Sequence, residues 1–231
     1  MIFNQFFDEV SYTYTYLLSS GKGREALIID PVLEKTDEYI SWLKKLDLKL
    51  VKVIDTHIHA DHVSGMKELH KQTDCANVMG EKSPSEVVNI KVKDNEKIKI
   101  ENIELISMYT PGHTDCSYSF LTKDRIFTGD TLLINGTGRT DFQNGNSIDQ
   151  YHSLFNRILK LPENTFVYPA HDYKGKKVST IGDEKKNNPR LKVDSADQYA
   201  ELMNNLNLDN PKMMDIVVPA NIKGKTLDQV S

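Results

Sequence analysis

The segment Thr56-His57-Ile58-His59-Ala60-Asp61-His62 places three histidines and an aspartate within seven consecutive residues. It directly follows Leu48 to Ile54, which we predict to be an apolar strand. On a helix, His57 and His59 would point about 200° apart and could not share one metal ion. In a loop at the end of a strand, His57, His59 and Asp61 can turn inward together, unlike the two histidines of a helical HExxH motif. The segment therefore predicts a metal-binding loop.

Three later apolar segments also end in a histidine or an aspartate. They are Ile103 to Tyr109 before His113, Arg125 to Phe127 before Asp130, and Thr165 to Tyr168 before His171. Strand ends that gather at one edge of a sheet are where α/β proteins place their sites. Together with the loop, these side chains form a set of imidazoles and carboxylates that suits a transition metal.

Two histidines and both cysteines fall outside this pattern. His70 and His152 lie on predicted helices, and we interpret them as surface or packing residues. Cys75 and Cys116 are too few for a disulfide framework and too far apart for a Cys-x-x-Cys motif. We expect both to be buried or idle thiols.

The composition indicates a globular protein and argues against several classes of partner. Hydrophobic residues make up 39% of the 231 residues and charged residues 27%, so a large core can form without disulfides. The net charge of −4 gives no basic surface for nucleic acid or an anionic membrane, and we predict neither partner. The first residues lack the features of a signal or transit peptide. We predict a cytoplasmic protein, and a mature mitochondrial form stays open.

The predicted elements mix strands and helices. We expect strands at residues 10–18, 24–30, 48–54, 76–79, 96–100, 103–109, 117–122, 125–128 and 165–168, and helices at residues 34–46, 63–72, 147–159 and 195–206. This order favours an α+β fold of two sheets with helices outside. No linker divides the chain, so we predict a single domain over residues 1–231 with a short C-terminal extension from about residue 195.

The histidine and aspartate pattern resembles that of the metallo-β-lactamase superfamily. Its members carry His-x-His-x-Asp-His, here residues 57–62, followed by equivalents of His113, Asp130 and His171. The resemblance covers residues of about 10–180 and implies a four-layer αββα sandwich, the metallo-β-lactamase fold. The superfamily includes hydrolases with two zinc ions and oxygenases with one iron, and the shared motif does not separate them.

Five further segments look like those of the persulfide dioxygenases, the family of the ethylmalonic encephalopathy protein. They are Gly138 to Gln143, Tyr168 to Tyr173, Asn188 to Leu191, Asn205 to Leu208 and Val218 to Asn221. This resemblance implies a dioxygenase that converts glutathione persulfide, O₂ and water to glutathione and sulfite.

The resemblance also implies which residues hold the metal. One Fe(II) per chain would be bound by His57, His113 and Asp130, a two-histidine, one-carboxylate set that leaves coordination positions for substrate and O₂. Around it, four residues would orient these ligands or hydrogen-bond to water and oxygen species. These four are His59, Asp61, His62 and His171.

The substrate's two carboxylates predict cationic and hydrogen-bonding partners near the metal. Our candidates are Arg139, Tyr173 and Arg190, since all three lie in the family-specific segments. Each arginine could equally form a surface ion pair, and Tyr173 could be a packed ring. Where many relatives have a glycine soon after the histidine, this chain has Asp115-Cys116-Ser117. Cys116 could approach the substrate, although we favour its interpretation as a small strand residue.

Two other functions stay open at this point. A thioester hydrolase similar to glyoxalase II would use all seven side chains to hold two Zn²⁺ ions and act on S-acylglutathione. A metal-dependent sensor or binding module would keep the fold without turnover. A homodimer is compatible with the sequence but is not indicated by any residue pattern.

Overall fold

Two six-stranded sheets form the centre of the computed structural model, which describes residues 1–206, 208, 213–225 and 229. The first sheet has the order β1-β2-β3-β4-β5-β6 and the second the order β12-β11-β10-β9-β8-β7. The strands of the first are Ile2–Asp8, Thr13–Ser19, Glu25–Ile29, Lys49–Ile54, Ala76–Gly80 and Ile90–Val92 for β1 to β6. Those of the second are Lys97–Ile100, Ile103–Tyr109, Tyr118–Leu121, Arg125–Gly129, Phe166–Pro169 and Ser179–Thr180 for β7 to β12.

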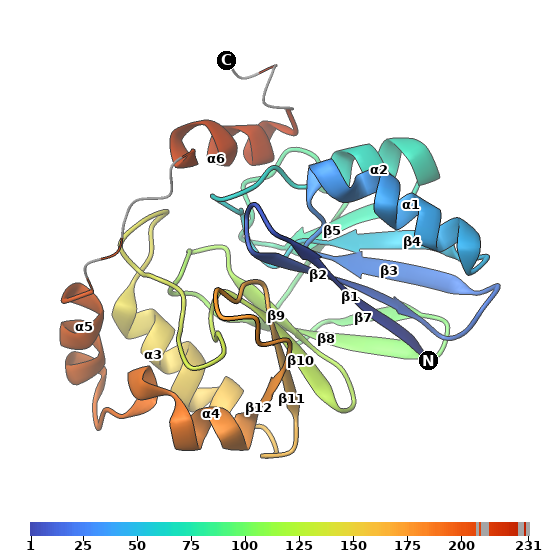
Figure 1. The fold of residues 1–231 in the computed structure, drawn as a ribbon. Coiled ribbons are helices and arrows are strands. Elements are labelled where there is room, and N and C mark those ends of the chain that lie inside the picture. Colours follow the sequence, from blue (N-terminus) through green and yellow to red (C-terminus); the bar gives the residue numbers. More distant parts are fainter. Residues whose placement is uncertain (207, 209–212, 226–228, 230–231) are drawn as a thin grey trace.

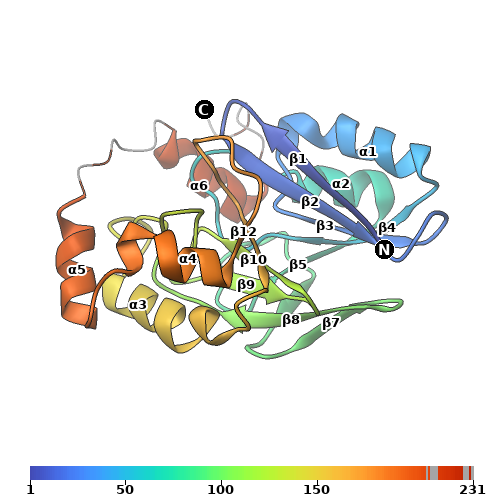
Figure 2. The same cartoon turned by 60° about the horizontal axis from the view of Figure 1, so that its bottom comes forward.

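Helices cover the outer face of each sheet (Figures 1 and 2). The first sheet carries α1 (Thr36–Lys45) and α2 (Met66–Thr73). The second carries α3 (Ser147–Asn156), α4 (Ile181–Asn187) and α5 (Ala196–Asn204). A sixth helix, α6 (Met214–Lys223), lies apart from them, and short 3-10 helices span Leu33–Lys35, Ile158–Lys160 and Pro189–Leu191.

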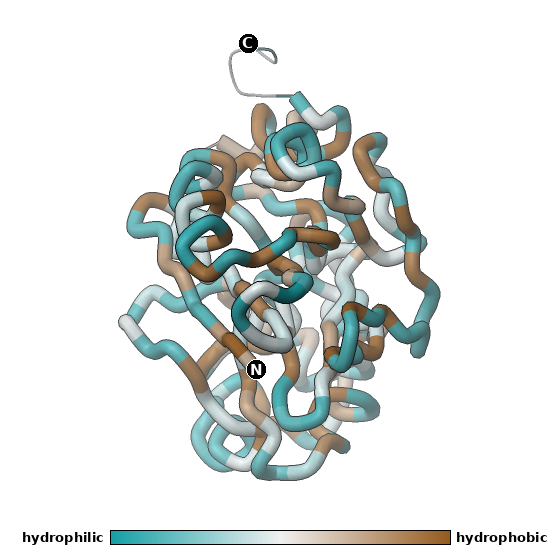
Figure 3. The backbone as a smooth tube through the Cα atoms, turned by 90° about the vertical axis from the view of Figure 1, so that its right-hand side faces the viewer, coloured by the Kyte–Doolittle hydropathy of each residue, from teal (hydrophilic) through white to brown (hydrophobic). Residues whose placement is uncertain are grey.

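Three layers of apolar side chains hold the sandwich together. Between the sheets, Tyr16, Ile29 and Leu105 are among the fully buried residues that join the two inner faces. The outer clusters fill the space between each sheet and its helices. Along the outer helical turns, hydrophobic and hydrophilic residues alternate (Figure 3), as expected for helices with one apolar face. The predicted αββα sandwich is therefore confirmed.

The N-terminal region differs from our prediction of one strand at residues 10–18. It forms a hairpin of β1 and β2 in which Phe3 pairs with Leu18 and Phe7 with Tyr14. The turn lies between residues 9 and 12, and Tyr12 there has a left-handed backbone with a φ of 59°. Every residue of β2 is buried, because both faces of the sheet are covered. The alternation of tyrosines was therefore a misleading indication of a half-exposed strand.

Other elements were not predicted at all, namely β6, β12, α4 and α6, in addition to β1. The short strands lie at sheet edges, where few residues pair, and α4 has only seven residues. The predicted helix at residues 63–72 begins later, at Met66, because Ser64 forms a β-bridge with Val32.

The last part of the chain contributes to two different regions. Tyr199 and Met203 of α5 pack into the core beneath the second sheet, and Val217 and Ala220 of α6 pack against Val63. Residues 207, 209–212, 226–228, 230 and 231, which include Asn207 of a family-specific segment, lie outside the described residues. The division into one domain and a C-terminal extension stays a prediction. None of the described helices combines the length and apolar composition that a membrane crossing needs.

Candidate metal centre

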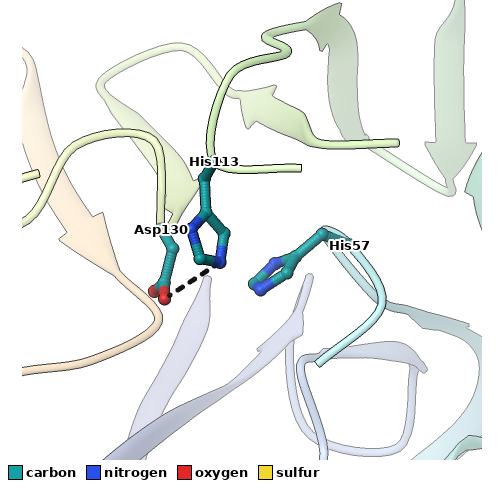
Figure 4. Close-up of side chains that lie close together, drawn as sticks. All are labelled: His57, His113 and Asp130. Carbon is teal, nitrogen blue, oxygen red and sulfur yellow. Dashed lines mark ion pairs between the residues drawn. The ribbon is translucent and has the colours of Figure 1, made fainter. Parts of the chain in front are cut away.

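The predicted metal ligands meet at the carboxyl ends of strands from both sheets. His57 follows β4, His113 follows β8 and Asp130 follows β10. One ligand atom from each of these three residues lies within 4.8 Å of the other two. Figure 4 shows the two imidazole rings and the carboxylate turned toward a common space. The arrangement follows from the chain direction, because β8 and β10 are both antiparallel to β9 and so end at the same edge.

His57 is held in a single orientation by a chain of hydrogen bonds. Its Nδ1 lies 2.9 Å from Thr56 Oγ1, and that hydroxyl donates in turn to Asp30 Oδ2 at 3.1 Å. Asp30 Oδ1 also accepts the backbone N–H of Thr56 at 2.7 Å. With Nδ1 carrying the proton, the lone pair of Nε2 is available to a metal. Burial lowers the pKa of His57 well below its usual value, so the ring is neutral and can bind without losing a proton.

His113 is oriented by the loop that follows Asp130. Its Nδ1 donates to the backbone carbonyl of Arg139 at 2.7 Å, which leaves Nε2 on the metal side, 3.5 Å from Asp130 Oδ2. Gly138 makes this contact possible, because a Cβ there would collide with the backbone oxygen of Asp130 and with the His113 ring. The family-specific segment that begins at Gly138 therefore supports a metal ligand through its backbone.

His171 bridges two carboxylates. Its Nδ1 donates to Asp130 Oδ1 at 2.7 Å and its Nε2 to Asp61 Oδ2 at 2.8 Å. Burial alone would lower the pKa of His171, but the two carboxylates outweigh it and raise the pKa well above its usual value. The same contacts lower the pKa values of Asp61 and Asp130 in spite of their burial. His171 therefore keeps Asp130 ionised and fixes which oxygen faces the metal.

His59 and His62 lie beneath the ligands with their rings 4.4 Å apart. His59 Nε2 lies 3.2 Å from Asp30 Oδ1, and that carboxylate overcomes the effect of burial and raises the pKa of His59 to about 9. His62 Nδ1 donates to Asp61 Oδ2 at 2.9 Å. The other ring nitrogens, His59 Nδ1 and His62 Nε2, are buried and have no hydrogen-bond partner among the described residues.

Two sets of residues at this centre fit a metal, and they share no residue. The first is His57, His113 and Asp130, and the second is His59, Asp61 and His62, whose ligand atoms also lie within 4.8 Å of one another. Histidine nitrogens and carboxylate oxygens suit iron as well as zinc. Because the pKa of His59 is raised, an ion at the second set would have to displace one of the two protons on that ring, whereas the first set contains a neutral His57.

Two residues of the centre were missed by the sequence reasoning. Thr13 Oγ1 donates to Asp61 Oδ2 at 3.1 Å and lies 3.2 Å from His62 Nδ1 and 3.1 Å from His171 Nε2. Nothing near Thr13 in the sequence indicates this role. Asp30, in contrast, ends a predicted strand before Pro31, so the rule that found Asp130 would also have found it.

A cavity of about 690 Å³ opens above the ligands, and the three predicted substrate residues line it. Arg190 Nη1 donates to the backbone carbonyl of Thr137, and no carboxylate of the described residues lies within ion-pair distance of it. Arg139 forms two hydrogen bonds to Asp141, both 2.7 Å long. Tyr173 is 64% exposed, and its ring stacks on His171 with centroids 6.1 Å apart.

The histidines and cysteines outside the pattern lie away from this cavity. His70 Nδ1 contacts the backbone oxygen of Cys75 at 2.6 Å, and His152 contacts Asn156 on the surface of α3. Cys75 and Cys116 are free and buried in the core outside the first sheet. Burial raises the pKa of the Cys116 thiol, which makes it a poor nucleophile.

The fold and this centre define a metallo-β-lactamase-type metalloprotein. The family model described as the metallo-β-lactamase superfamily matches residues 8–86 and 83–171. The chain therefore belongs to that superfamily.

More specific relatives cover nearly the whole chain. The mitochondrial persulfide dioxygenase ETHE1 of Mus musculus is 41% identical over 226 residues, which are 96% of this chain and 88% of the relative. The crystal structure of ETHE1 from Myxococcus xanthus is 44% identical, with a TM-score of 0.95 over 98% of this chain and 100% of that one. A hydroxyacylglutathione hydrolase of Dictyostelium discoideum is 35% identical but covers 69% of this chain and 62% of the relative. Within the superfamily, the chain belongs to the persulfide dioxygenases.

Proposed function

We propose that the protein is an iron-dependent persulfide dioxygenase that acts on glutathione persulfide. The reaction takes one persulfide, one O₂ and one water and yields glutathione, sulfite and two protons. The observation that carries the proposal is the cluster of His57, His113 and Asp130, whose ligand atoms lie within 4.8 Å of one another. Such a two-histidine, one-carboxylate set is typical of non-haem Fe(II) oxygenases. The likeness to the mouse persulfide dioxygenase ETHE1 and to ETHE1 of Myxococcus xanthus supports the same reaction.

The residues of the chain prepare the centre for this chemistry. When bound, Fe(II) would supply electrons to O₂, which Zn²⁺ cannot do. His57 and His113 would each present Nε2, because the Nδ1 of each ring is hydrogen-bonded elsewhere. Asp130 would present Oδ2, since Oδ1 accepts from His171. Because its pKa is raised, His171 can stay protonated while it donates one hydrogen bond to Asp130, at 2.7 Å, and one to Asp61.

The cavity fits a tripeptide thiol with an extra sulfur. Its volume of about 690 Å³ lies within the usual range for small-molecule sites. Arg190 faces it without a carboxylate partner among the described residues, so a substrate carboxylate can bind there without displacing one. Arg139 is already paired with Asp141 through two hydrogen bonds, and Tyr173 offers a ring and a hydroxyl at the mouth.

The location and assembly of the protein stay predictions. The cytoplasmic location stays untested, while the mouse and human relatives are named as mitochondrial. The homodimer likewise stays a prediction.

A binuclear thioester hydrolase is the second candidate, because the second ligand set of His59, Asp61 and His62 is also preassembled. The decisive experiment is metal analysis of anaerobically purified protein, together with O₂ uptake and sulfite formation on glutathione persulfide. About one iron per chain with stoichiometric O₂ uptake supports the dioxygenase. Two tightly bound zinc ions with hydrolysis of S-lactoylglutathione would replace it with the hydrolase.

A further inference from the structure

The side chain of Asn221, on α6, reaches the metal-binding loop from behind. Its Nδ2 donates to the backbone carbonyls of His59 and His62, both at 2.9 Å. Its Oδ1 accepts the backbone N–H of Ser64 at 2.8 Å. The side chain is 7% exposed, so these three bonds form in a largely dry environment.

The three bonds determine both the identity and the orientation of the amide. Rotating it by 180° would place Oδ1 against two carbonyl oxygens and Nδ2 against an N–H donor. Aspartate lacks the two donors, serine has one donor, and glutamine is longer by a methylene. The two donors and one acceptor of asparagine therefore match the two carbonyls and the N–H of this loop. A contact that only held α6 in place would not need all three groups.

The loop that Asn221 holds is connected to two predicted metal ligands. One path runs from Asp61 through His171 to Asp130, with contacts of 2.8 and 2.7 Å. The other runs from His59 through Asp30 and Thr56 to His57. A shift of the backbone between residues 59 and 64 would disturb both paths.

α6 is also held by contacts that do not involve the Asn221 side chain. Ser85 Oγ donates to the backbone oxygen of Asn221 at 3.1 Å, Glu86 N donates to Ile222 O at 2.8 Å, and Lys67 Nζ donates to Gly224 O at 2.7 Å. Figure 1 shows α6 beside α2, the helix that carries Lys67. These three hydrogen bonds anchor α6, whereas the side-chain amide of Asn221 bonds to the loop of residues 59–64.

We propose that Asn221 is a positioning residue of the metal centre, which sets the backbone of residues 59–64 and, through it, the orientation of His57 and Asp130. α6 lies beyond the residues that the superfamily model matches, so this role is supplied by the C-terminal part of the chain. It applies to any transition metal in the site and goes beyond the reaction proposed above.

The test measures Co²⁺ binding to the metal-free full-length chain, by competition with a chelator and by the visible absorption of bound cobalt. Asn221→Asp keeps the size of the side chain but loses both donors. Its Kd for Co²⁺ should rise about 10- to 100-fold, the range typical of partners that orient metal ligands, and the cobalt absorption should change. Asn221→Ser, with one donor, should lie between the wild type and Asn221→Asp.

Ser85→Ala and Lys67→Met are the matched controls, since each removes an anchor of α6 and leaves the amide in place. Both should bind Co²⁺ within about twofold of the wild type. Wild-type Co²⁺ affinity and absorption in folded Asn221→Asp or Asn221→Ser would overturn the proposal. An equal loss of Co²⁺ affinity in the two controls would also overturn it, because the affinity would then depend on the docking of α6. Should Asn221→Asp fail to fold, Asn221→Ser decides. Because the readout is cobalt binding, the result is independent of whether the protein oxidises persulfides.

Discussion

The floor of the cavity and its mouth are built in different ways. On the floor, His57, His113 and Asp130 are each tied by a hydrogen bond on the side away from the metal space. At the mouth, Tyr173 is 64% exposed, and the hydrogen bonds of the Arg190 side chain to described residues go to Thr137. The comparison indicates that hydrogen bonds within the protein orient the three predicted metal-binding side chains before a metal binds. The contacts to the substrate, in contrast, would form when the substrate binds. Changes on the floor should therefore act on the metal, and changes at the mouth on the substrate.

The largest effect is expected from removing a ligand. His113→Ala should lose iron and reduce activity by more than the roughly 100-fold that is typical of residues around a metal site, because two ligands cannot form the set. Metal analysis and O₂ uptake check both parts. A His113→Ala protein that kept full iron would show that the ligand assignment is wrong.

A smaller loss is expected from His171→Ala, which removes the partner of Asp130 but no predicted ligand. Iron affinity or activity should fall about 10- to 100-fold. His152→Ala is the control, since His152 lies on the surface of α3 and should leave both values unchanged. If His171→Ala and His113→Ala lost metal equally and completely, the binuclear zinc centre would be the better description.

At the mouth, Arg190→Ala should lower kcat/KM for glutathione persulfide about 10- to 100-fold, equivalent to a charge-assisted contact of about 1.5–3 kcal/mol. Iron content should stay the same, which separates this variant from those on the floor. The reaction of a small persulfide without carboxylates should be affected much less. Arg190→Lys should recover only part of the loss, because lysine keeps the positive charge but lacks the planar fork of the guanidinium.

Arg139→Ala should have a weaker effect than Arg190→Ala, because Arg139 is already paired with Asp141. Steady-state kinetics of both variants test this ranking. Unchanged kinetics in both would mean that neither arginine binds the substrate, and the thiol carrier would have to be sought elsewhere.

A further prediction concerns stability rather than catalysis. Asp55, buried behind the metal loop, has an Oδ1 without a hydrogen-bond partner among the described residues, and burial raises its pKa to about 7. A raised carboxyl pKa contributes stability that is fully present below the unfolded-state value of about 4 and is lost as the pH rises through 7. Asp55→Asn should therefore gain on the order of 2 kcal/mol relative to the wild type between pH 5 and pH 8.

Urea unfolding of metal-free protein at both pH values measures this difference. If the free energies of unfolding of wild type and Asp55→Asn differ by the same amount at pH 5 and pH 8, the pKa of Asp55 is not raised.

The gathering of the candidate residues could be predicted from the sequence, but the contacts that orient them could not. His57, His113, Asp130 and His171 each follow a strand, and strand ends gather at one edge of a sheet. The choice of His57, His113 and Asp130 as metal ligands came from the family resemblance and stays a prediction. The contact of Thr13 with Asp61, and that of Asn221 with the loop, join residues far apart in the chain and leave no local pattern. The edge strands and α4 were missed because a few residues show too little periodicity.

The ligands come from both halves of the sandwich, His57 from the first sheet and His113 and Asp130 from the second. An ion bound there would fasten the two halves to each other, and an unfolded chain would not hold it. Binding to the folded state alone adds about 2.7 kcal/mol when free metal is a hundred times its Kd. A difference of that size changes how much of a protein escapes proteolysis in a cell. The supply of the bound metal would then influence the abundance of this protein as well as its activity.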